Sequence, residues 1–453
     1  MDKAQFICNL KTGGHKDMTA VIGLLNKRGV AIAADSAVTR NRDNNEKVTK
    51  NGSKMLRMSN AVPISVMLTG NGDYICNPWD VVVRQYRRER GDIKHATVEA
   101  CAHDFFGYIA KKDVFWNDDY INLWIRQELE GIFRYVAQMI PWELSTTKKD
   151  GTYIKPKAHL KAFIKSLKQV QKRALSNGIG HQFEDYTIED FSSYAKPAID
   201  MFLDSITETG DFKPENIYPK EFLEAIRPIL EQTLMARLTT RSEGNRHAEL
   251  VFSGYGEEQE YPSLVSAIVF EGVDHRVNYH IRPEDIICIS DERPVAFCPF
   301  AQADVTKSII CGQHDIWNER ILQTTVNKYH NVLKEFLSLN NEKIDFEFEI
   351  MLYEVEFYDL IDRYSKSINR LLTKNQHEWE KTLEHYDLKA MAALAESLID
   401  LTGFHRILTF EQEGVGGPVD VAVITKNEGF TWLSRKSWYH HKDVNGMYGS
   451  LGI

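Results

Sequence analysis

Four short apolar segments lie near the start of the chain, and their pattern is typical of β-strands. The first two, residues 19–25 (TAVIGLL) and 29–35 (GVAIAAD), are apolar at nearly every position. Because a strand with one wet face alternates apolar and polar residues, these runs predict a sheet that is covered on both faces. Residues 54–60 (KMLRMSN) and 63–70 (PISVMLTG) predict two further strands, the second of which ends in the turn at Thr69–Gly72.

Two stretches after this turn have apolar residues at helical spacing. Residues 77–90 predict a helix that Asp73 caps, and residues 97–110 predict a second helix. The first of these is basic, with four arginines at Arg84, Arg87, Arg88 and Arg90. We interpret them as a solvated helix face, with a nucleic-acid site as the alternative.

Residues 111–245 differ in character, because aromatic helical segments surround a lysine-rich span at residues 148–172. This composition predicts an inserted helical region. Strand patterns return in AELVFSGYG (residues 248–256), PSLVSAIVFEG (262–272) and the pair RVNYHI (276–281) with DIICIS (285–290). Together they predict an antiparallel meander.

Long helices, many of them polar, are expected over residues 315–400. The last shows the clearest periodicity, with Gly403 as its expected C-cap and an apolar face made by Leu388, Met391, Leu394, Leu398 and Leu401. Residues 417–425 (GPVDVAVIT) and 429–436 (GFTWLSRK) predict a closing strand pair. The order of the elements predicts an α+β core in which two sheets lie between helical layers.

This order divides the chain into seven parts. They are a leader (residues 1–18), the first half of the core (19–110), a helical insertion (111–245), core strands (246–315), a second helical insertion (316–384), the last core helix with the closing strands (385–436) and a C-terminal tail (437–453).

Composition narrows the class of protein. With 43% hydrophobic and 26% charged residues, the chain is typical of globular proteins. The net charge of −9 argues against nucleic acid or an anionic membrane as a general partner, and leaves open only a local basic patch, such as the span at residues 148–172.

The cysteines and the apolar runs bear on location. Six cysteines without a CxxC pair argue against a disulfide framework and a thiolate zinc site, and they fit a reducing cytoplasm. The adjacent His440 and His441 lack a third ligand at a telling spacing, so no metal is expected. No apolar run approaches the roughly 20 residues that span a bilayer, and residues 1–18 lack the apolar stretch of a signal peptide.

Three polar residues at strand ends carry candidate chemistry: Thr19, Asp35 and Lys54. If Thr19 were the first residue, its own α-amine, with a reference pKa of about 8, would serve as the base that activates the hydroxyl. A lysine would favour the nucleophilic form, and a carboxylate would orient that lysine and keep it charged. Backbone N–H groups of the turn at residues 70–72 would suit a developing oxyanion. These are the parts of an amidase.

These segments resemble the proteasome β-subunit type (HslV-like) of N-terminal-nucleophile (Ntn) hydrolases. In that family a nucleophilic threonine precedes an aspartate by the same sixteen residues that separate Thr19 from Asp35. KMLRMSN and PISVMLTGNGD resemble its lysine-led strand, the next strand and the glycine turn, with a few extra residues before Lys54. The turn at Gly416–Gly417 resembles the family's entry into a closing strand. The resemblance covers residues 19–110, 246–315 and 385–436.

The resemblance implies a four-layer αββα sandwich and a threonine-type peptidase or amidase that needs no cofactor. It assigns the nucleophile and the α-amine base to Thr19, supporting roles to Asp35 and Lys54, and the oxyanion N–H to Gly70. It also implies a peptide or protein substrate, a homo-oligomer, and an ATPase or another protein partner that binds through the insertions.

The chain departs from the family before the Gly416–Gly417 turn. Where the family has an aspartate and a serine, this chain has Gln412 and Val415. Glu413 is a candidate replacement. Gln302 and Asp304 are the candidates for the family's remaining serine. These departures motivate the alternative function, a catalytically inactive proteasome-like scaffold or interaction protein.

An N-terminal nucleophile also requires that Thr19 become the first residue. Self-cleavage of a propeptide, translation from Met18 followed by loss of that methionine, and a leader that persists and silences the site are three explanations. Family propeptides place glycine before the threonine, whereas Asp17–Met18 precede Thr19 here. This difference favours translation from Met18.

Overall fold

The computed structural model describes residues 20–36, 38–42, 45–49, 54–145, 155–207, 218, 220–241, 247–301, 304–312, 346–408 and 417–435, with short helical pieces between residues 320 and 335. The fold is α+β, as predicted, and its strand pairs are antiparallel.

One sheet has five strands in the order β13-β1-β2-β14-β15. Their bounds are β1 Ala20–Asn26, β2 Gly29–Ala34, β13 Val295–Ala301, β14 Asp420–Thr425 and β15 Gly429–Ser434. Every residue of β1 and β2 is buried, which confirms the prediction of strands covered on both faces. The closing strand pair is also confirmed.

A second sheet has six strands in the order β11-β10-β9-β6-β5, with β12 also paired to β10. Their bounds are β5 Met55–Arg57, β6 Ile64–Gly70, β9 His247–Gly254, β10 Ser263–Phe270, β11 Tyr279–His280 and β12 Ile286–Cys288. The predicted pairing of residues 276–281 with 285–290 is wrong. Because β10 is long enough for both, β11 pairs with its end at Ile268 and β12 with its start at Ser263. Two small hairpins complete the strands, β3 Val38–Arg42 with β4 Asn45–Thr49 and β7 Asp73–Tyr74 with β8 Asn77–Pro78.

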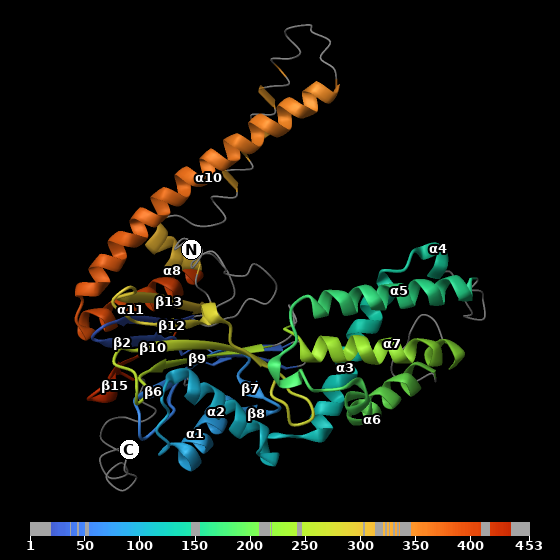
Figure 1. The fold of residues 1–453 in the computed structure, drawn as a ribbon, viewed down its shortest axis with the longest axis horizontal. Coiled ribbons are helices and arrows are strands. Elements are labelled where there is room, and N and C mark those ends of the chain that lie inside the picture. The colour runs from blue at the N-terminus through green and yellow to red at the C-terminus, as the bar shows by residue number, and fades with distance from the viewer. Residues whose placement is uncertain are drawn as a thin grey trace.

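The two sheets share an apolar interior. Val21 and Ile32 of the five-stranded sheet belong to the same buried cluster as Met67 and Leu264 of the six-stranded sheet. The opposite face of the five-stranded sheet packs against α11 (Leu388–Leu408), and that of the six-stranded sheet packs against α1 (Trp79–Arg90) and α2 (Val98–Ala110) (Figure 1).

Helices α3 to α7 lie outside these layers, whereas α8 and the end of α10 at Leu383 pack beside α11. Figure 1 shows the helical region of α3 to α7 to one side of the sheets, and α10 rising above the sheets from their opposite end. Their bounds are α3 Asp118–Gln138, α4 Trp142–Ser145, α5 Pro156–Leu175, α6 Ile188–Thr207, α7 Lys220–Thr239, α8 Asp304–Cys311 and α10 Phe346–His385. We searched the described residues for a helix with the length and hydropathy of a membrane span and found none.

The expectation that Asp73 caps the first helix is wrong. Asp73 starts the β7–β8 hairpin, whose turn places Ile75 and Cys76 in the left-handed region, at φ 45° and 62°. The buried Glu271 carboxylate stabilises this turn by accepting the Ile75 N–H at 3.0 Å. Helix α1 therefore begins later, at Trp79.

The expected apolar face of α11 is confirmed at Met391 and Leu398, which are buried, and at Leu388 and Leu394, which pack against the same cluster. The end of the helix differs from the expectation. Leu401 is 47% exposed, and Gly403 lies inside the helix rather than at its C-cap. The side facing the sheet contains small residues, among them Ala392, Ala395 and Gly403. Because small side chains allow a helix to approach closely, the packing follows this face and the larger Leu401 lies outside.

Candidate functional site

The structure brings Asp35 and Lys54 together at one end of the sheet interior. The Lys54 Nζ lies 2.6 Å from the Asp35 Oδ1. Asp35 is 1% exposed and Lys54 is 6% exposed, so both charges are removed from water. Asp35 reaches this position because it directly follows β2, while Lys54 directly precedes β5 in the other sheet. The pair therefore joins the two sheets.

The same aspartate holds the start of β1. Its Oδ1 accepts the N–H of Ala20 at 2.9 Å, and its own N–H donates to the Ala20 carbonyl at 3.1 Å. Ala20 is the residue that follows Thr19 in the chain. Asp35 thus connects the start of the first strand to the lysine.

Burying such a pair is costly unless the geometry and the remaining hydrogen bonds are good. Apolar residues of similar volume often serve stability equally well. A buried lysine–aspartate pair among apolar strands is therefore better explained by what its charges do locally than by the stability of the core.

Gly70 is the last residue of β6, and the edge of β6 that faces Lys54 is identified by a backbone hydrogen bond. The Leu68 N–H donates to the Lys54 carbonyl at 2.8 Å, and N–H groups two residues apart in a strand point to the same edge. The Gly70 N–H is thereby directed to the Lys54 edge. Gly70 itself is exposed and has φ +75°, and a Cβ at this position would lie 2.5 Å from the His247 carbonyl oxygen. This position requires glycine.

A second buried carboxylate was missed by the sequence analysis. Asp420 is 2% exposed and begins β14, where it lies opposite Ala34, the residue before Asp35. Ser36 strengthens the same junction, because its hydroxyl donates to the Pro418 carbonyl at 2.5 Å. The available signal was a carboxylate at the start of an otherwise apolar strand, which mirrors Asp35 at the end of one.

Asp304 begins α8, which follows the end of β13 opposite Ala20. Its Oδ1 lies 2.5 Å from a guanidinium nitrogen of Arg406, which is 8% exposed, so the carboxylate links α8 to α11. The other predicted site residues, Thr19, Gln302 and Glu413, lie outside the described residues. Gln412 and Val415, the departures from the family pattern, also lie outside them, as do His440 and His441.

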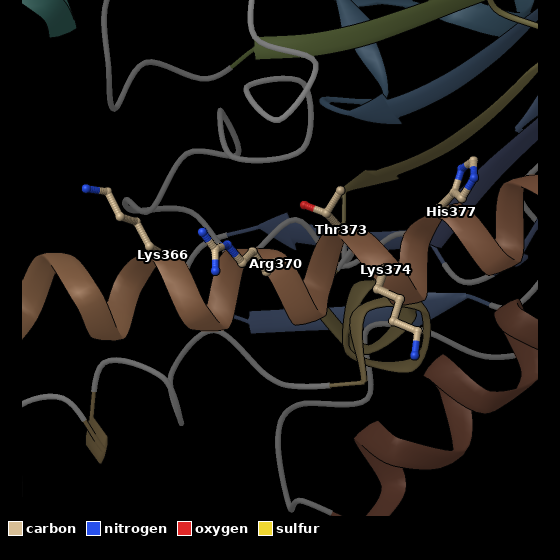
Figure 2. A pocket seen from close by; sticks show the side chains of 5 residues that line it. All are labelled: Lys366, Arg370, Thr373, Lys374 and His377. Carbon is tan, nitrogen blue, oxygen red and sulfur yellow. The ribbon is translucent and has the colours of Figure 1, made fainter.

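A hollow of about 500 Å³ lies elsewhere, along α10. The side chains that line it are Lys366, Arg370, Thr373, Lys374 and His377. Figure 2 shows that all five come from one helix, with Lys366 and Lys374 pointing to opposite sides of it. Because these groups do not converge on one point, the hollow lacks the enclosed geometry of a catalytic pocket.

Comparison with models of known protein families and with curated proteins found no match to this chain. A search of the described residues for three or more His, Cys, Asp or Glu side chains arranged to hold a metal ion also found none. The case for a function therefore depends on the geometry around Asp35 and on the sequence resemblance.

Proposed function

We propose that this chain is a proteasome-like threonine peptidase or amide-bond hydrolase whose working form begins at Thr19. The observation that carries the proposal is the buried Lys54–Asp35 pair, with Asp35 also bound to the backbone of Ala20. A lysine and a carboxylate at this point would lie beside the residue whose hydroxyl and amine do the chemistry.

In the proposed reaction the Thr19 hydroxyl oxygen attacks the carbonyl carbon of an amide, and the Thr19 α-amine takes the hydroxyl proton. The positive charge of Lys54, held by Asp35, favours the deprotonated oxygen. The Gly70 N–H donates to the oxyanion of the tetrahedral intermediate. The intermediate then expels the amine, which takes the proton from the α-ammonium, and leaves an ester on Thr19. Water hydrolyses this ester and returns the free threonine.

The arrangement of layers supports the same proposal. Two antiparallel sheets share one apolar interior, α11 covers the outer face of one sheet, and α1 with α2 covers the other. We propose that these layers form the four-layer αββα sandwich of the Ntn hydrolases. A cytoplasmic location, a peptide or protein substrate, self-association and an ATPase or other protein partner follow from the cysteine pattern and the resemblance.

A catalytically silent scaffold is the second candidate, and the replacement of the family's supporting residues by Gln412 and Val415 favours it. The position of Asp420 favours activity instead, because this buried carboxylate begins the strand that follows the same turn. The two candidates differ in one measurable property, which is covalent reactivity of Thr19.

The first experiment is intact mass with N-terminal sequencing of protein expressed from its native gene context. We expect a chain that begins at Thr19. That form should give a covalent adduct with an electrophilic peptide probe. A chain that retains residues 1–18 lacks the free α-amine of Thr19, so it should hydrolyse amides about 10²–10⁴-fold more slowly, which is the usual contribution of a general base.

Two variants make the result decisive. Thr19→Ala should lose the adduct, whereas Thr19→Ser keeps a hydroxyl and an amine and should retain it. The hydrolase hypothesis would be wrong, and the scaffold hypothesis favoured, if a folded chain that starts at Thr19 formed no adduct with a range of peptide and amide probes.

A further inference from the structure

Helix α5 presents a row of lysines to solvent. The exposed members are Lys157, Lys161, Lys165, Lys168 and Lys172. Their spacing of three and four residues places them within an arc of about 80° of the helix circumference, along about 22 Å of its length. Helix α5 contains no carboxylate, so its own sequence does not neutralise this lysine stripe.

The opposite side of α5 is fixed in the helical region. His159, Phe163 and Leu167 are buried there, and His159 also donates from Nδ1 to the Leu144 carbonyl at 3.1 Å. Phe163 packs against Phe133 of α3 and Phe222 of α7. Since the packed face cannot rotate, the lysine stripe is held outward as a rigid surface.

Neighbouring helices treat their basic residues differently. Arg227 of α7 contacts both Asp200 and Glu231, and Arg237 contacts Glu128 of α3. In contrast, none of the five lysines of the stripe forms an ion pair with a carboxylate in the part of the chain that the structure describes. A row of like charges without counter-charges is electrostatically unfavourable by itself and attracts an external polyanion.

We propose that the lysine stripe of α5 binds the phosphate backbone of a nucleic-acid duplex without reading its sequence. A duplex presents one negative charge per about 1.7 Å of its axis, so a 22 Å row of lysines meets a continuous series of phosphates. This proposal concerns a surface on the helical region and is independent of the threonine chemistry.

The composition of the stripe favours a duplex over an unpaired nucleic-acid strand or a lipid surface. Both ring side chains of α5, His159 and Phe163, are buried, so the helix offers no platform for stacking unpaired bases. Its apolar face packs within the protein, so it is not available for insertion into a lipid surface. Lysine acts toward phosphate as a point charge, which suits backbone binding that does not read the sequence.

The test is binding of the full-length chain to fluorescent 30-base-pair DNA and RNA duplexes of unrelated sequence, followed by anisotropy from 50 to 200 mM salt. Five phosphate contacts predict a slope of about −4.5 in a plot of log K against log salt, or about a 500-fold loss over this range. Affinity should not depend on sequence. A strong sequence preference or a flat salt dependence would overturn the proposal.

A matched pair of variants locates the surface. The triple change Lys161→Glu, Lys165→Glu, Lys168→Glu should weaken binding at 100 mM salt by at least about tenfold and flatten the slope by about 2.7. The control triple Lys94→Glu, Lys220→Glu, Lys426→Glu alters the net charge equally at exposed lysines that already have carboxylate partners. It should bind much more tightly than the stripe variant.

Two outcomes would contradict the assignment. Equal weakening by both triple variants would show a general charge effect rather than a site on α5. Binding of polyglutamate in preference to either duplex would identify the partner as an acidic protein. Circular dichroism of each variant establishes that the helices are intact, and because all three lysines are exposed, we expect no change there.

Discussion

The sheet core and the helical region of α3 to α7 handle charge in opposite ways. Strands β1 and β2 are buried at every position, and the Lys54–Asp35 pair lies between the sheets with almost no access to water. In the helical region the charges lie on the surface, and many are paired along one helix, as Lys196 is with Asp200.

This difference determines which charges are informative. In the core any charge is an exception that must be offset by a partner, so the pair itself marks the candidate site. In the helical region paired charges are ordinary, because surface pairs contribute little to stability. There the exception is the stripe on α5, whose lysines lack described carboxylate partners. The candidate site in the core is thus identified by a charge that has a partner, and the lysine stripe by charges that lack one among the described residues.

Breaking the buried pair is the strongest test of this contrast. Asp35→Asn removes the carboxylate charge beside the Lys54 ammonium, and we expect the free energy of unfolding to fall by about 3–5 kcal/mol. The matched change in the helical region, Lys196→Ala, removes an exposed pair and should cost about 0.2–0.5 kcal/mol. Urea unfolding of both variants under one set of conditions gives the two values.

A double variant separates charge from shape at the same place. In Asp35→Leu with Lys54→Met, both buried charges are gone, so we expect a smaller loss of stability than the two single changes produce together. Strictly additive losses would show that the two side chains contribute independently, against the role that we assign to their contact.

Gly70 offers an intermediate test within the core. Gly70→Ala places a Cβ 2.5 Å from the His247 carbonyl oxygen in a left-handed backbone, so we expect a loss of about 1–3 kcal/mol. Gly72 provides the control, because a Cβ there would meet nothing within 4 Å. Gly72→Ala should stay within about 0.5 kcal/mol. Equal effects in thermal unfolding would contradict the strained position of Gly70.

The smallest expected effect is a pH dependence of the helical region. Burial lowers the pKa of His159 below its ordinary value of 6.5, although the hydrogen bond to the Leu144 carbonyl acts in the opposite direction. The folded state therefore disfavours the protonated ring. The contribution of the neutral His159 ring to the free energy of unfolding is therefore fully present above pH 6.5 and decreases as the pH falls below that value.

Hydrogen exchange of α5 amides at pH 7.5 and 5.5 measures this effect locally. We expect faster exchange at pH 5.5 in the wild-type chain, after correction for the intrinsic pH dependence of exchange. His159→Leu should reduce that difference. If the variant and the wild type change equally with pH, another group is responsible.

Much of the core could be predicted because its strands are unambiguous. Continuous apolar runs located β1, β2, β6 and β14, and the residue types at strand ends indicated the pair of Asp35 and Lys54, which the structure brings into contact. Strand β13 was not predicted from the sequence, and its Pro299 argues against a strand by residue type. Proline is tolerated there because β13 forms the edge of its sheet.

The errors share a physical cause, which is that tertiary packing overrides local signals. Asp73 is a good helix cap by type, but the hairpin held by Glu271 moves the start of α1. Gly403 is a good helix stop by type, but close packing on the sheet continues α11 past it. Asp420 was missed because only the pairing of β14 with β2 shows that it lies beside Asp35.

The two hydrogen bonds between Asp35 and Ala20 also affect how the protein is prepared. They fix the first strand from the side of Asp35, whatever precedes residue 19. An affinity tag fused upstream should therefore leave the fold intact, yet it would occupy the amine that the proposed chemistry needs. A preparation with such a tag would pass every test of folding and still give no turnover. Activity should therefore be measured with a tag at the other end of the chain, or after a tag has been removed to expose Thr19.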